Sequence, residues 1–139
     1  MKTPITGGCV CGEVRYECTA RPLVMLKCHC RDCQQISGGP YVAVVVVPIK
    51  AFRITKGALQ HFATPSHHGG HNKRGFCGKC GSRLTGAENP ERGIIGLTAS
   101  SLDDPSCFRP TMNIFVAEAQ PWDLMDPDLP KHERYPPHS

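Results

Sequence analysis

The alternation of hydrophobic and polar residues is clearest near the N-terminus, over residues 12–18. Val14, Tyr16 and Cys18 share one side there, and charged residues occupy the positions between them. Alternation with a period of two is typical of a strand with one buried face. A continuous apolar run follows at residues 41–47, and its β-branched valines suit a strand covered on both faces. The pattern therefore predicts a core built from strands.

Shorter apolar segments separated by Gly, Pro and Asn turns predict further strands at residues 23–28, 52–55, 59–64, 74–77, 94–98 and 113–117. Helix signals are few: a turn or two after Cys30, and a second start at Ser101, which acidic residues follow. The chain has 14 Gly and 13 Pro among 139 residues, which favours turns over long helices. We therefore expect a mainly β fold with few short helices.

The length is that of one domain, and we place it at residues 1–125. Residues 126–139 are rich in Pro and charge, so we expect a surface tail with little to bury. No segment approaches the roughly 18 consecutive apolar residues of a membrane span. The first residues lack the apolar stretch of a secretory signal, so we expect a cytoplasmic protein with reduced thiols.

Seven of the nine cysteines are spaced as metal ligands. Cys77 and Cys80 form a Cys-x-x-Cys pair with neighbouring glycines, which is typical of a zinc knuckle. A closed tetrahedral site needs four ligands, and Cys9 and Cys11, two positions apart on one strand face, are the natural partners. The spacing thus predicts a structural zinc on these four residues. Structural zinc can release roughly 10–16 kcal/mol on binding, comparable to the whole stability of a domain at roughly 5–15 kcal/mol.

The second cluster consists of Cys28, Cys30 and Cys33. Cys28 and Cys30 share a strand face, and Cys33 can return after one tight turn. Three thiolates leave the fourth position of a zinc ion open, as in catalytic zinc sites. The alternatives are a second structural zinc or three reduced buried thiols.

A histidine is the obvious candidate to close this second site. His29 lies between two of the ligands, and strand alternation points its side chain to the opposite face. His67, His68 and His71 lie in a Gly-rich loop and are the other candidates. We expect Cys18 to be a core thiol and Cys107 to be a loop residue.

Five motifs resemble the glutathione-dependent formaldehyde-activating enzyme and centromere protein V family, and they run from residue 8 to residue 122. They are Gly8-Cys9-Val10-Cys11-Gly12, Cys28-His29-Cys30-x-x-Cys33, Ser37-Gly38, Phe76-Cys77-x-x-Cys80-Gly81-Ser82 and Pro121-Trp122. The resemblance implies a β-tent fold of small antiparallel sheets. It also implies a structural zinc on Cys9, Cys11, Cys77 and Cys80 and a second zinc on Cys28, Cys30 and Cys33.

The resemblance further implies a carbon–sulfur lyase that adds glutathione to formaldehyde. An open zinc can hold a thiolate or polarise an aldehyde oxygen, and three thiolate ligands favour exchange of sulfur over formation of hydroxide. We therefore expect reversible addition of a thiol such as glutathione to formaldehyde or another small aldehyde. Residues 34–40 follow the second cluster and are a candidate wall of its site.

The main alternative is a zinc-stabilised interaction domain without catalysis. Such a domain would show a clustered basic face, whereas Lys and Arg are scattered here and Lys73-Arg74 is the nearest approach to a patch. The formal charge of +4 would fall to about +1 with seven thiolates and two zinc ions, so we expect no nucleic-acid partner. A redox enzyme using Cys18 or Cys107 is a third possibility, but neither lies in an electropositive context.

Overall fold

The computed structural model describes residues 1–67 and 69–137. The fold is mainly β, as predicted, with strands β1 Ile5–Gly8, β2 Arg15–Cys18, β3 Val24–Cys28, β4 Val42–Pro48, β5 Phe52–Lys56, β6 Gln60–Pro65, β7 His71–Phe76, β8 Arg83–Asn89, β9 Ile94–Thr98 and β10 Asn113–Ile114. The helical elements are α1 Arg31–Ser37 and the 3-10 turns η1 Ile49–Ala51, η2 Ala99–Ser101, η3 Pro105–Cys107 and η4 Val116–Glu118. Within these ranges no helix has the length and apolar character needed to cross a membrane.

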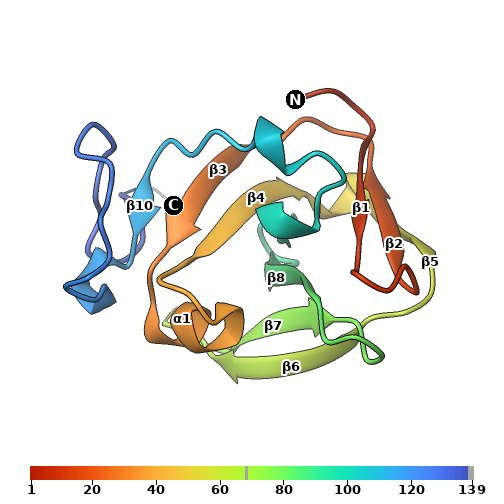
Figure 1. The fold of residues 1–139 in the computed structure, drawn as a ribbon, viewed down its shortest axis with the longest axis horizontal. Coiled ribbons are helices and arrows are strands. Elements are labelled where there is room, and N and C mark those ends of the chain that lie inside the picture. The colour runs from red at the N-terminus through yellow and green to blue at the C-terminus, as the bar shows by residue number, and fades with distance from the viewer. Residues whose placement is uncertain (68, 138–139) are drawn as a thin grey trace.

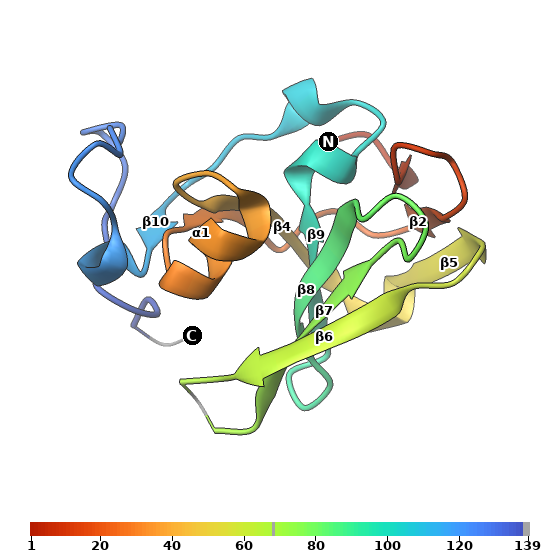
Figure 2. The same cartoon turned by 60° about the horizontal axis from the view of Figure 1, so that its bottom comes forward.

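The strands form two sheets of unequal size. The small sheet has the order β1-β2-β5 and is antiparallel, whereas the large sheet has the order β10-β3-β4-β9-β8-β7-β6. Only the short β10 runs parallel to its neighbour β3 among the described strands. Figure 1 shows the large sheet bending from β3 and β4 at the top of the view to β7 and β6 at the bottom. The helix α1 packs beside β4 (Figure 2).

Several predicted elements agree with the structure, and three details do not. The helical turn after Cys30 is present as α1, but the helix expected from Ser101 is wrong. The 3-10 turn η2 ends at Ser101, whose hydroxyl donates to the Thr98 carbonyl 2.8 Å away. β1 and β8 had no predicted counterpart. The strand expected over residues 113–117 ends at Ile114, because Phe115 takes the left-handed conformation with φ of 58°.

The main core lies where the small sheet packs on the large one. Val14, Tyr16 and Cys18 are at most 1% exposed, so the predicted face of the first pattern is the buried one. The Tyr16 hydroxyl lies 2.6 Å from Ser101 Oγ, which joins β2 to the turn after β9. Gly7 is required beside them, because a Cβ there would lie 2.3 Å from the Ser101 carbonyl oxygen.

The C-terminal segment lies along β10, on the left of Figure 1. The backbone N–H of Asn113 donates to the Pro130 carbonyl, and the N–H of Phe115 donates to the Arg134 carbonyl. Tyr135 then packs its ring edge-on against Phe115, with centroids 4.8 Å apart. Pro130, Lys131, Glu133 and Arg134 are exposed, and His132 and Tyr135 are half-buried, so the segment is held along β10 while it stays at the surface. The domain boundary at residue 125 stays a prediction.

Candidate metal centres

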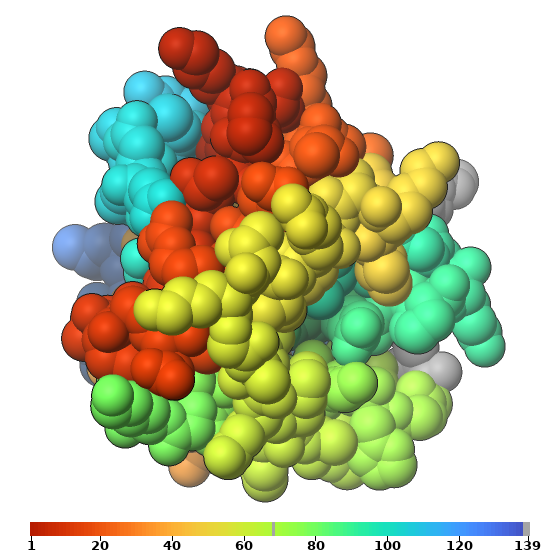
Figure 3. Space-filling view, turned by 90° about the vertical axis from the view of Figure 1, so that its right-hand side faces the viewer, coloured from red at the N-terminus to blue at the C-terminus, as the bar shows by residue number. Residues whose placement is uncertain are grey.

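The four-sulfur cluster consists of Cys9, Cys11, Cys77 and Cys80. Cys9 and Cys11 lie in the loop after β1, and the other two lie in the turn after β7, so the cluster joins loops of both sheets. Figure 3 shows these two loops side by side at the lower left, in red and light green. The four sulfur atoms all lie within 4.8 Å of one another. Cys77 and Cys80 therefore lie beside Cys9 and Cys11, as predicted.

The spacing of these sulfur atoms fits a tetrahedral metal ion. Cys11 Sγ lies 3.6 Å from Cys9 Sγ and 3.8 Å from Cys77 Sγ. Four sulfurs bound to zinc at about 2.3 Å are about 3.8 Å apart at the corners of a tetrahedron. The backbone N–H of Val14 donates to Cys9 Sγ over 3.2 Å, as expected for a sulfur that carries negative charge. The donor set and its geometry therefore fit a structural zinc.

Hydrogen bonds favour the thiolate form of Cys80 at this cluster. Ser82 hydrogen-bonds Cys80 through its hydroxyl, with Oγ 3.2 Å from Sγ, and lowers the pKa of Cys80 to about 5. The backbone N–H of Lys79 donates to Cys77 Sγ over 3.4 Å. Zinc binds thiolates, so a lowered cysteine pKa reduces the competition from protons.

The three-sulfur cluster consists of Cys28, Cys30 and Cys33, and its sulfur atoms also lie within 4.8 Å of one another. Cys28 ends β3, and Cys33 lies in the first turn of α1. Cys30 is the N-cap of this helix, and its Sγ accepts a hydrogen bond from the Cys33 N–H over 3.3 Å. Hydrogen bonds from Cys28 and Cys33 lower the pKa of Cys30 to about 2. The cluster therefore holds at least one thiolate near neutral pH.

A buried arginine faces this cluster, although its sequence context showed it only as half of the weak basic pair Lys73-Arg74. Arg74 extends from β7 and is 7% exposed. Its Nη1 lies 3.9 Å from Cys33 Sγ, and its Nη2 donates to Thr64 Oγ1 over 3.3 Å. Asp32 is the nearest carboxylate partner, at 4.0 Å. The guanidinium charge thus lies beside the thiols and favours their ionised form.

A cavity of about 460 Å³ opens beside the three-sulfur cluster, and we call it the cluster cavity. All three cysteines line it, together with Arg74. The rest of its wall is largely apolar and includes Val24, Leu26, Val44, Val46, Ile94, Met112, Ile114, Phe115 and Tyr135. The four-sulfur cluster borders no part of this cavity. The three-sulfur cluster therefore faces a space large enough for a small molecule.

His29 cannot close the three-sulfur site in this conformation. Its ring is fully buried on the opposite face, as alternation predicted, and both nitrogens have partners. Nδ1 lies 2.5 Å from Asp123 Oδ2, and Nε2 lies 2.7 Å from Asn113 Oδ1. His29 therefore ties β3 to β10 and to the segment after η4. No sequence pattern pointed to Asp123 as its partner, because the two residues lie far apart in the chain.

The loop histidines also stay outside the cluster. His67 lines the cluster cavity, but its Nε2 points toward Glu118 Oε2, 3.9 Å away, and its ring packs on Phe115. His71 begins β7 and is exposed. His68 lies outside the described residues. Among the residues that the structure describes, no histidine joins the three sulfurs.

Residues 34–40 were expected to line the site of the three-sulfur cluster, but they do not line the cluster cavity. They form the end of α1 and the turn after it, and Gln34 is buried, donating to the carbonyls of His29 and Glu118. Ser37 and Gly39 border a different cavity. The prediction that residues 34–40 form a wall of the three-sulfur site is therefore wrong.

The two remaining cysteines behave as simple thiols. Cys18 is fully buried in the main core, as predicted, and burial raises its pKa. Cys107 lies in the 3-10 turn η3, where a hydrogen bond to Asp104 raises its pKa. Raised pKa values leave few thiolates at neutral pH, which argues against a redox nucleophile at either position.

Two comparisons place this architecture among known proteins. The profile of the family described as glutathione-dependent formaldehyde-activating enzyme matches residues 4–118, which include both cysteine clusters. The fold is also similar to the crystal structure of a Rhodobacter sphaeroides protein, with a TM-score of 0.59 and 19% identity. That similarity covers 91% of this chain and 98% of the other, and at this identity it supports the fold alone. Since the family profile spans most of the sequence, the chain belongs to the glutathione-dependent formaldehyde-activating enzyme family.

Proposed function

We propose that this protein catalyses the reversible addition of a thiol, such as glutathione, to formaldehyde or another small aldehyde at the three-sulfur cluster. The observation that carries the proposal is the position of these three thiols in the wall of the cluster cavity, beside a buried arginine. The family description supports the same chemistry. The four-sulfur cluster serves as the structural metal site in this proposal.

Three soft sulfur ligands within 4.8 Å of one another suit a zinc ion. Zinc held by Cys28, Cys30 and Cys33 would supply Lewis acidity and a fourth coordination position. The chain itself supplies a positive charge at Arg74, which offsets the negative charge of the three thiolates. A cluster with its charge partly offset tolerates the approach of a further thiolate.

The reaction needs no oxidant and no leaving group. The thiolate sulfur adds to the carbonyl carbon, and the carbonyl oxygen takes up the proton that the thiol has lost. The product is a hydroxymethyl thioether when the aldehyde is formaldehyde, and the reverse reaction breaks the same carbon–sulfur bond. The apolar wall, with Val44 and Ile114 among its members, excludes water and strengthens the interaction of charges inside the cavity.

The decisive experiment compares the wild type with Cys30→Ser. Serine is a favoured N-cap, so this change preserves the start of α1 while it removes one sulfur ligand. The readouts are zinc per chain and the rate of exchange between ¹³C-formaldehyde and its glutathione adduct, followed by NMR. We expect two zinc ions in the wild type, one in the variant, and loss of the rate acceleration with the melting temperature nearly unchanged.

Cys107→Ser is the matched control, because its thiol lies outside both clusters. It should retain both zinc ions and full activity. Full activity in Cys30→Ser would contradict the proposal. A wild type that binds zinc at both clusters but does not accelerate exchange with any small aldehyde would favour the non-catalytic interaction domain.

A further inference from the structure

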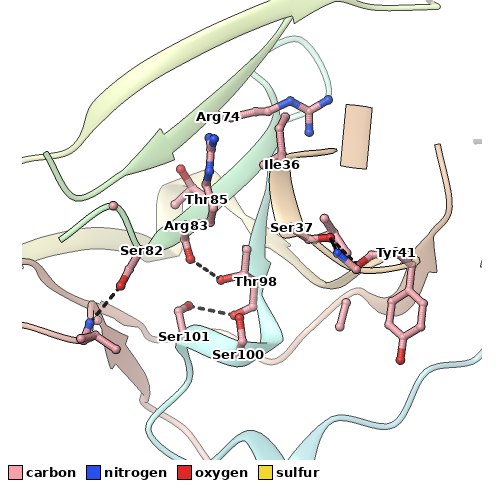
Figure 4. A pocket seen from close by; sticks show the side chains of 16 residues that line it. Ile36, Ser37, Tyr41, Arg74, Ser82, Arg83, Thr85, Thr98, Ser100 and Ser101 are labelled. Carbon is pink, nitrogen blue, oxygen red and sulfur yellow. Dashed lines mark hydrogen bonds between the residues drawn. The ribbon is translucent and has the colours of Figure 1, made fainter. Parts of the chain in front are cut away.

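A second cavity, of about 590 Å³, also reaches Arg74, and we call it the arginine cavity. Its wall includes Arg74 and Arg83 together with hydroxyl side chains from the loops and strands around them, among them Ser82, Thr85, Thr98 and Ser100. In Figure 4 the Arg83 side chain points toward Arg74, and the serine hydroxyls lie below it in the view. The described residues of this wall include no Asp or Glu.

The positive charge of Arg83 in this cavity is poorly compensated. Burial and the neighbouring charge of Arg74 lower the pKa of Arg83. Arg83 Nη1 and Arg74 Nε are both buried without a hydrogen-bond partner. The Arg83 guanidinium packs over the Phe76 ring, 5.3 Å from its centroid, and forms no ion pair with a carboxylate of the described chain. Arg74 has Asp32 and the thiols as neighbours, but the Arg83 charge lies near a like charge without a carboxylate of its own, which is costly unless an anion joins it.

The hydroxyl groups add uncharged donors beside the arginines. The hydroxyls of Thr85 and Ser100 make no hydrogen bond with another described residue, so both can donate to a bound group. The Ser82 hydroxyl is already held in place, since it accepts from the Val10 N–H over 3.0 Å. Guanidinium groups with neighbouring hydroxyls are well suited to oxyanions, because each oxygen accepts several hydrogen bonds.

We propose that the arginine cavity binds the oxyanion group, a carboxylate or a phosphate-like group, of a small molecule, with Arg83 as its principal ligand. The site is distinct from the cluster cavity, and Arg74 and Val42 line both. It does not depend on the reaction proposed for the three-sulfur cluster.

The test titrates the zinc-loaded full chain with sulfate and, separately, with succinate, replacing chloride at constant ionic strength. Calorimetry gives the affinity, and ¹⁵N NMR maps the amides that shift. We expect saturable binding, with shifts at Ser82, Arg83 and Ser100. Saturation by both anions identifies a general oxyanion site, and saturation by succinate alone identifies a carboxylate site.

Arg83→Gln should weaken binding at least about tenfold, because it removes a charged hydrogen-bond donor. Arg21→Gln is the matched control, since it removes the same charge from an exposed position and should leave the affinity unchanged. If Arg83→Gln fails to fold, Thr85→Val and the wild-type shift map decide the question.

Three outcomes would overturn the proposal. They are the absence of saturable binding by either anion, equal binding by Arg83→Gln, and shifts that map outside the arginine cavity. Cys30→Ser separates this site from the metal, because an anion bound to the three-sulfur metal would lose affinity in that variant. An anion in the arginine cavity should bind Cys30→Ser as well as it binds the wild type.

Discussion

The two cysteine clusters use the same ligand chemistry in different surroundings. The four-sulfur cluster joins two loops that are far apart in sequence, and the spacing of its four donors fits a tetrahedral metal site. The three-sulfur cluster lies between the end of β3 and the start of α1, where its residues are close in sequence and face a cavity. A metal at the first cluster would close a long loop, whereas a metal at the second would add little to chain connectivity. The number of donors and the presence of a cavity are therefore the features on which we base the proposal of a structural role for the first cluster and a reactive role for the second.

The largest expected effect comes from Cys77→Ser at the four-sulfur cluster. Cys77 is 1% exposed and lies in the main core, so its loss removes a metal ligand where both sheets meet. Structural zinc binding is worth about 10–16 kcal/mol, so we expect no cooperative unfolding transition in the variant. Circular dichroism melting and zinc content measure the effect. Equal melting temperatures for Cys77→Ser and Cys30→Ser would remove the distinction between the clusters.

The next effect concerns Asp123, whose side chain is 2% exposed beside His29. Asp123→Ala leaves the buried His29 Nδ1 without a partner, and breaking such a pair costs about 3–5 kcal/mol. Because His29 lies between two ligands, we also expect weaker metal binding at the three-sulfur cluster and no change at the four-sulfur cluster. Urea unfolding and zinc content are the measurements. Asp128→Ala, at an exposed position of the same segment, should have little effect.

Arg74→Gln tests the charge beside the three-sulfur cluster. The positive charge of Arg74 favours thiolates, so its removal raises the pKa values of the thiols and strengthens proton competition. The metal at this cluster should therefore bind about 10–100-fold more weakly and leave at a higher pH than in the wild type. Metal content after dialysis at a series of pH values measures the shift.

Lys73→Gln is the matched control for this prediction. Lys73 is the preceding residue, but its side chain is 52% exposed and lies 3.6 Å from Glu88. Removing it changes the net charge by the same amount without changing the cluster. A shift of the same size in both variants would mean that net charge, and not the position of Arg74, controls metal release.

The sequence predicted those parts of the site that depend on local spacing. Cys28, Cys30 and Cys33 meet because a strand and one helical turn bring nearby residues together, and the opposite orientation of His29 follows from the same alternation. The pairing of Cys9 and Cys11 with Cys77 and Cys80 was predicted from the number of ligands that a closed site needs. Whether both clusters hold zinc stays a prediction.

The parts that sequence could not predict depend on distant contacts. Arg74 reaches Cys33 across 41 positions, and Asp123 reaches His29 across 94, without any local pattern to link them. The strand β1 was missed because it contains two glycines, which weaken strand propensity. Gly7 lies there because Tyr16 and Ser101 leave no room for a side chain, a reason that appears only after the sheets pack.

The smallest expected effect concerns the exposed ion pair between Arg15 and Asp103, which contrasts with the buried Arg74. Arg15 donates to both carboxylate oxygens of Asp103, and Arg15 and then Thr6 hold the pKa of Asp103 below its usual value. The two side chains are 36% and 46% exposed, so Asp103→Asn should cost only about 0.5 kcal/mol. A carboxyl with a lowered folded pKa stabilises the fold above its unfolded pKa of about 4, so this cost should stay constant between pH 7 and 5.5.

The effect of Arg74→Gln acts through thiols and metal and should vary over the same range. Urea unfolding of Asp103→Asn at both pH values, repeated at high salt where the cost should shrink, would show whether burial separates the two arginines.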